Sequence, residues 1–128
     1  MSDALNPHPS LTQPQREAIF DLLLLAMYSD DMLKLKENER LYELISGIEW
    51  ESYQEPREYS ELATARVRAV YESAVGLEPF LAQIADTLGD TSRKEFALVL
   101  LERLLETDGL IVDPEHRLHE KAKAAFGL

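Results

Sequence analysis

Acidic side chains gather at two predicted breaks between helices, where their oxygens are the hard ligands that Ca²⁺ and Mg²⁺ prefer. The first group is Asp30, Asp31 and Glu39, and the second is Asp108, Asp113 and Glu115. We interpret these residues as a binding site for a divalent cation or for a partner protein. Neither break has the EF-hand spacing D-x-[DN]-x-[DN]-G-x₅-E. The alternative is therefore a structural role, in which the acids cap helices and hydrate the surface.

A second candidate site is the aromatic and acidic connector at residues 48–59. It contains Trp50, the only tryptophan of the chain, and Tyr53. Aromatic side chains of this kind commonly line pockets for small molecules. The other interpretation is that they pack against neighbouring helices and close one side of the core.

The motifs of catalysis and of nucleotide binding do not occur. No serine lies in a G-x-S-x-G context, and neither G-x-x-x-x-G-K-[ST] nor G-x-G-x-x-G is present. His116 and His119 lie close together in the sequence, but a zinc site needs three or four ligands and the only other histidine is His8. We therefore expect no catalytic residues, no enzymatic activity and no cofactor apart from a divalent cation.

The charge of the chain limits its partners. With 24 acidic and 13 basic residues the net charge is −11, which repels phosphates and argues against nucleic acids and anionic membrane surfaces. A basic protein partner fits this charge better, and a homodimer is the other association left open. The longest apolar stretch, residues 18–28, is shorter than the ~20 residues of a membrane span. Residues 1–15 lack a signal-peptide pattern and cysteine is missing, which favours the cytoplasm.

Helix signals recur along the chain and predict an all-α, single-domain bundle of about six helices. Thr12 and Gln15 form a capping box, and so do Ser92 and Glu95. The helices that these boxes begin are apolar nearly all round, which is typical of central helices. The expected helices are residues 12–29, 37–48, 60–75, 79–89, 92–106 and 114–126. Residues 1–11 are predicted to be a flexible tail and residues 12–128 the domain.

The two ends of the chain resemble each other. A shift of 77 residues aligns residues 16–45 with residues 93–122 without gaps, and eight positions are identical. Each copy reads as a capped apolar helix, an acidic break, an apolar loop residue and an amphipathic helix. We interpret the copies as two duplicated αα-hairpins that pack together, with two middle helices as cover. Unrelated hairpins with a common pattern are the alternative.

Residues 104–115, which read Leu-Leu-Glu-Thr-Asp-Gly-Leu-Ile-Val-Asp-Pro-Glu, resemble the helix-break-helix signature of the TerB-like tellurite-resistance family. The N-terminal domain of a DnaJ-type membrane co-chaperone is similar. The resemblance covers residues 12–126, although Met32 and Lys34 of the first copy stand where the second has Gly109 and Ile111. It implies a duplicated all-α module of bacterial stress responses that acts in the cytoplasm through partners or metal ions, without a known reaction.

Overall fold

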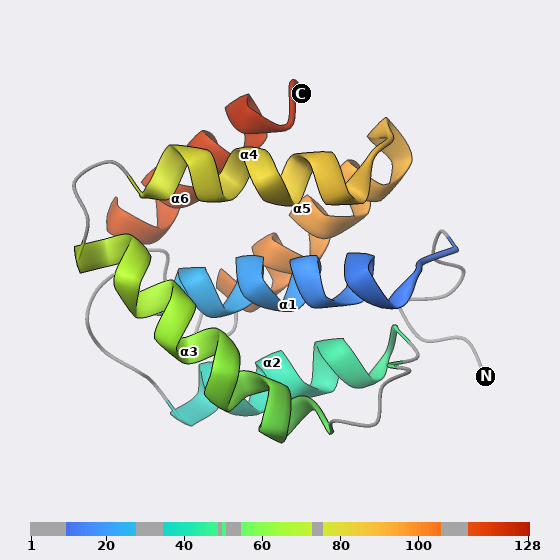
Figure 1. Ribbon diagram of the computed structural model, residues 1–128, viewed down its shortest axis with the longest axis vertical. Coiled ribbons are helices and arrows are strands. Elements are labelled where there is room, and N and C mark those ends of the chain that lie inside the picture. Colours follow the sequence, from blue (N-terminus) through green and yellow to red (C-terminus); the bar gives the residue numbers. More distant parts are fainter. Residues whose placement is uncertain (1–9, 28–34, 49, 51–54, 73–75, 106–112) are drawn as a thin grey trace.

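The computed structural model describes residues 10–27, 35–48, 50, 55–72, 76–105 and 113–128, with side chains except at 35–38, 71, 72, 105 and 113–117. These residues form six helices and no strand (Figure 1), so the predicted all-α bundle is confirmed. The helices are α1 (Gln13–Met27), α2 (Leu35–Ser46), α3 (Pro56–Glu72), α4 (Leu77–Leu88), α5 (Thr91–Leu105) and α6 (Asp113–Ala125). None of these described helices is long and apolar enough to cross a membrane.

Helix α1 lies at the centre of the bundle, as its all-round apolar sequence predicted. It contacts α2, α3, α4 and α5, and Figure 1 shows it between α4 and α5 on one side and α2 and α3 on the other. Its side chains from Leu22 to Met27 are all buried, as are Ile19 and Phe20. Asp21 interrupts this apolar surface, and it faces the side of α1 that α3 and α4 share.

The two predicted hairpins occupy matching places in the chain. The shift of 77 residues carries α1 onto residues 90–104 and α2 onto residues 112–123, close to the observed α5 and α6. Helices α1 and α5 lie against each other, α2 packs against both, and α6 packs against α4 and α5. Arg16 and Arg93, an identical pair in this alignment, each donate from Nε to a distant backbone carbonyl, that of Ile48 and that of Ser10 respectively, at 2.7 Å.

Local hydrogen bonds explain where α1 and α5 begin. The predicted capping box of α1 is confirmed, because Thr12 N donates to Gln15 Oε1 at 2.9 Å and Gln15 N donates to Thr12 Oγ1 at 3.3 Å. Helix α5 begins one residue earlier than predicted, and Asp90 caps it by accepting the Arg93 N–H at 2.9 Å. The prediction that Ser92 caps this helix is therefore wrong, since Ser92 already lies inside its first turn.

Helix α3 begins four residues before the predicted position, at Pro56. Proline is favoured at the first position of a helix, where no N–H is needed. The N–H of Glu55 donates to Glu58 Oε1 at 3.0 Å, as in the reciprocal half of a capping box. The consequence for function is that Tyr59 lies in the first turn of α3 rather than in a connector.

The ends of the bundle also follow from single residues. Gly89 ends α4 as predicted, with φ of 87° and its N–H bonded to Ala85 O at 3.0 Å. Leu11 is buried in the core, so the packed part of the chain begins inside the predicted tail. Residues 1–9 of that tail lie outside the described residues.

Candidate functional site

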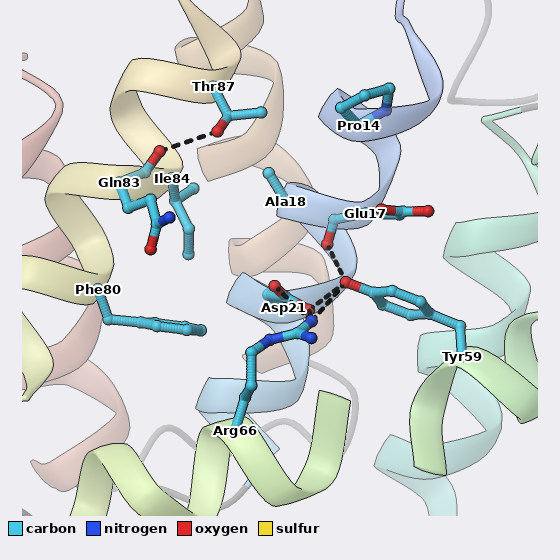
Figure 2. A pocket seen from close by; sticks show the side chains of 10 residues that line it. All are labelled: Pro14, Glu17, Ala18, Asp21, Tyr59, Arg66, Phe80, Gln83, Ile84 and Thr87. Carbon is cyan, nitrogen blue, oxygen red and sulfur yellow. Dashed lines mark hydrogen bonds and ion pairs between the residues drawn. The ribbon is translucent and has the colours of Figure 1, made fainter. Parts of the chain in front are cut away.

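A cleft of about 360 Å³ opens between α1, α3 and α4 (Figure 2). We call it the α1–α3–α4 cleft. Helix α1 provides one side and α4 the facing side, while α3 contributes two side chains. The lining residues are Pro14, Glu17, Ala18 and Asp21 of α1, Tyr59 and Arg66 of α3, and Phe80, Gln83, Ile84 and Thr87 of α4.

The spacing of these residues follows from helix geometry. On both α1 and α4 the lining positions recur at intervals of three, four and seven residues, which places them on one helical face. The two helices run antiparallel (Figure 1), and Gln15 Nε2 in the first turn of α1 donates to the carbonyls of Thr87 and Leu88 at the end of α4, at 3.2 and 3.1 Å. The cleft therefore extends along two helical turns, roughly 10 Å.

A network of three polar side chains forms the centre of the cleft wall. The Tyr59 hydroxyl donates to Asp21 Oδ1 at 2.8 Å, and Arg66 Nη2 lies 3.1 Å from both Asp21 oxygens. Arg66 Nη2 also donates to the Tyr59 hydroxyl oxygen at 2.7 Å. Each group thus bonds both of the others, and the network ties α3 to α1 (Figure 2).

Burial and charge shift the protonation of all three groups. Burial raises the pKa of Asp21 above its ordinary 3.8, although the hydrogen bond from Tyr59 and the charge of Arg66 oppose the rise. Burial and then the neighbouring Asp21 carboxylate raise the pKa of Tyr59, so its hydroxyl keeps its proton at neutral pH. Burial by itself lowers the pKa of Arg66, but Asp21 and Tyr59 together raise it further than burial lowers it.

The network leaves hydrogen-bonding groups open toward the cleft. The side chain of Asp21 is 13% exposed, whereas that of Arg66 is 47% exposed and lies at the rim. Arg66 Nε and Nη1 donate to no residue in the described part of the chain, and the Gln83 side-chain amide has no bond there either. Glu17 Oε2 receives one long bond, from Gln13 Nε2 at 3.4 Å. A ligand in the cleft therefore meets both donors and acceptors.

Aromatic rings support the network from behind. The Tyr59 ring lies 5.2 Å from Phe20 and 5.3 Å from Trp50, measured between centroids. Trp50 is partly buried against the core and does not line the cleft. The α1–α3–α4 cleft is therefore not the pocket predicted at Trp50, and Trp50 packs against Phe20 and Tyr59, as in the alternative interpretation of the connector. Tyr53, the second residue of that prediction, lies outside the described residues.

Most of the predicted cation site also lies outside the described residues. This holds for Asp30, Asp31 and Asp108, and for the side chains of Asp113 and Glu115 at the start of α6. Glu39 is exposed on α2. Where side chains are described, no three metal-binding groups lie together. The prediction of a divalent cation at the acidic breaks is therefore not tested by the geometry.

Of the three histidines, only His119 has a described side chain. His119 is partly buried on α6, and its Nε2 lies 3.2 Å from Glu102 Oε1 of α5. The side chain of His116 is not described, and His8 lies outside the described residues. His119 thus joins two packed helices in addition to meeting solvent.

Sequence reasoning missed the three residues of the network for different reasons. Asp21 was visible as the one charged residue in the apolar run at residues 18–28. Tyr59 falls within the predicted connector, although Pro56 three residues before it is a signal for a helix start. Arg66 carries no local signal, since its partner Asp21 lies 45 residues away in the chain.

The resemblance to the TerB-like family rests on residues 104–115, of which residues 106–112 lie outside the described part. Comparisons of the chain with models of protein families, with curated proteins and with solved structures gave no match.

Proposed function

We propose that this chain is a non-enzymatic binding module that holds a small molecule in the α1–α3–α4 cleft. The observation that carries the proposal is the Asp21–Tyr59–Arg66 network, which converges on a cleft whose remaining lining combines apolar and polar side chains. Pockets for small molecules have volumes of roughly 300–1,000 Å³ and combine apolar walls with a few placed polar groups. At about 360 Å³ the cleft falls at the lower end of that range.

Protonation favours binding over catalysis at this site. A general base must accept a proton near neutral pH. The raised pKa values of Tyr59 and Arg66 hold both groups protonated there. Asp21 Oδ1 already accepts bonds from both partners. Tyr59 and Arg66 are thus better suited to orienting a ligand than to exchanging protons with it, and the bonds that Asp21 accepts hold its carboxylate in place.

A wider role as a TerB-like module of bacterial stress or tellurite resistance is a second proposal. The matching positions of the α1–α2 and α5–α6 pairs support it, and the net charge of −11 favours a basic partner protein or a divalent cation. In such a module the acidic breaks would engage the partner or the cation, while the cleft would hold the small molecule.

The experiment for the cleft is a screen of small metabolites against the full chain with isotope-labelled isoleucine methyl groups. Ile84 lines the cleft, whereas Ile45 is buried in the core away from it. We expect a ligand to shift the Ile84 methyl signal while Ile45 changes little. Trp50, in contact with Tyr59, gives a second readout through its fluorescence. A screen in which no compound moves Ile84 contradicts the proposal.

A variant that fills the cleft tests whether a ligand found in the screen binds there. Gln83 lines the cleft from an exposed position of α4, so Gln83→Phe should block the ligand without disturbing the core. Ala82 is the adjacent exposed residue and does not line the cleft, which makes Ala82→Phe the matched control. Equal loss of binding in both variants would place the ligand elsewhere.

A further inference from the structure

We infer that the α1–α3–α4 cleft selects a small zwitterion with an apolar body, of which an apolar α-amino acid is the simplest example. The inference rests on the proposed binding function and names the ligand class for that site. It depends on three features of the cleft: open donors on a cation, open acceptors on two carboxylates beside it, and an apolar surface formed by Phe80, Ile84 and Ala18.

The positive group is Arg66. Only its Nη2 is used within the described part of the chain, for Asp21 and Tyr59, which leaves the N–H groups of Nε and Nη1 to donate to a ligand. A carboxylate is the natural acceptor, because charge-assisted bonds of this kind are about twice as strong as neutral ones. Gln83 adds an amide on the facing wall of the cleft.

The negative groups are Glu17 and Asp21, one helical turn apart on the same face of α1. Asp21 Oδ2 accepts only from Arg66 Nη2 within the described residues, and an ionised carboxylate has about four acceptor sites. Both residues can therefore accept from an ammonium group. Glu17, with a single long bond from Gln13, has the larger spare capacity.

A ligand with one charge fits this lining poorly. A lone cation would approach Arg66, and a lone anion would approach Glu17 and Asp21, so either would be repelled at short range. A zwitterion satisfies both signs at once. An analogue that lacks one charge forgoes the charge-assisted bonds to either Arg66 or the two carboxylates, so it should bind more weakly than the zwitterion.

The apolar wall defines the rest of the ligand. Phe80 projects from α4 toward Asp21 and Arg66 (Figure 2), and Ile84 and Ala18 continue this surface. At about 30 Å³ per water the cleft holds roughly a dozen waters, a size suited to a ligand with a similar number of non-hydrogen atoms. An aliphatic or aromatic side chain would displace water from Phe80 and gain by its burial.

The test compares leucine with two analogues that each lack one charge. Isocaproate is leucine without its amine, and isoamylamine is leucine without its carboxylate. Binding to the full chain is followed by calorimetry and by the methyl shift of Ile84. We expect leucine to bind at least about tenfold more tightly than either analogue, since each lost charge-assisted bond is worth a factor of this order.

Substitutions of Arg66 and Glu17 test which residue binds the carboxylate of leucine and which binds its ammonium group. Arg66→Lys keeps a cation for Asp21 but removes Nε and Nη1, and should weaken leucine binding at least about tenfold. Arg68→Lys, on the same helix but outside the cleft lining, is the matched control and should leave binding unchanged. Glu17→Gln should weaken leucine and isoamylamine while sparing isocaproate. Thermal melts verify that each variant is folded.

The outcomes separate this inference from the proposed function. If either analogue shifts Ile84 as strongly as leucine does, the cleft still binds small molecules and the zwitterion inference is wrong. The zwitterion inference is also wrong if Arg66→Lys and Arg68→Lys bind leucine equally well. If neither leucine, its analogues nor any compound of the metabolite screen moves Ile84, both proposals fail.

Discussion

The Tyr59 hydroxyl joins two helices through one side chain, since it donates to Asp21 and accepts from Arg66. Tyr59→Phe removes this hydroxyl but keeps the ring against Phe20 and Trp50. We expect the free energy of unfolding, measured with urea, to fall by about 1–2 kcal/mol, because partly buried groups lose a hydrogen-bond partner.

Tyr42→Phe is the matched control for that substitution. The Tyr42 ring also meets Phe20, at 6.2 Å between centroids, but its hydroxyl bonds to no residue of the described chain. Its removal should change the unfolding free energy by less than about 0.5 kcal/mol. Equal losses at Tyr59 and Tyr42 would mean that the hydroxyl network adds nothing to stability.

The raised pKa of Asp21 makes stability depend on pH with a definite sign. Because the folded state holds this proton more tightly than an unfolded chain with a pKa of 3.8, the favourable contribution is present below that pH and is lost as pH rises through the folded pKa. Wild type should therefore be more stable relative to Asp21→Asn at about pH 3 than at about pH 7, in urea denaturation across that range.

The control for this pH profile is Asp86→Asn, at an exposed position of α4 outside the cleft lining. Comparison of the two asparagine variants isolates the effect of the position inside the cleft. A gap between wild type and Asp21→Asn that instead widens in favour of wild type toward neutral pH would show that Arg66 outweighs burial at Asp21.

Among the helices, α5 owes its start to a different residue from the one that its sequence suggested. Asp90 accepts the Arg93 N–H and also pairs with the Arg93 side chain. Asp90→Ala should lower the unfolding free energy by about 1 kcal/mol, the usual value of an N-cap, while Ser92→Ala should have an effect below about 0.5 kcal/mol. Thermal or urea unfolding of both variants distinguishes the two caps, and a larger loss at Ser92 would identify Ser92 as the cap after all.

Local signals were sufficient to predict the helices but not the cleft. Apolar periodicity, the Thr12–Gln15 box and Gly89 each act within a few residues, so they are legible in the sequence. The cleft instead depends on α3 crossing α1 so that Arg66 reaches Asp21, and these two residues lie 45 positions apart in the chain. The pattern of apolar residues does not predict such a crossing, because the crossing depends on how three helices pack together.

In the whole molecule the same helix supplies both the core and the cleft. Helix α1 packs against four other helices, so a charged residue on it has no fully exposed face to occupy. Asp21 is accommodated because α3 and α4 diverge over it and α3 provides Tyr59 and Arg66 as partners. A central helix that carries a charged residue within its apolar run thus leads to a cleft bordered by polar groups, and the proposed binding function rests on that placement.

The net charge of −11 makes the whole chain sensitive to ions. NaCl should raise the melting temperature by screening self-repulsion.

If the acidic breaks hold a divalent cation, CaCl₂ or MgCl₂ at equal ionic strength should stabilise the chain further. At a hundred times the dissociation constant, the free energy of unfolding should rise by about 2.7 kcal/mol. Asp31→Asn combined with Asp108→Asn should remove this excess, whereas Glu61→Gln, at an exposed site of α3, should retain it. Equal melting temperatures in matched salts would leave the acids as caps and surface charge, because general screening alone does not distinguish divalent from monovalent ions at equal ionic strength.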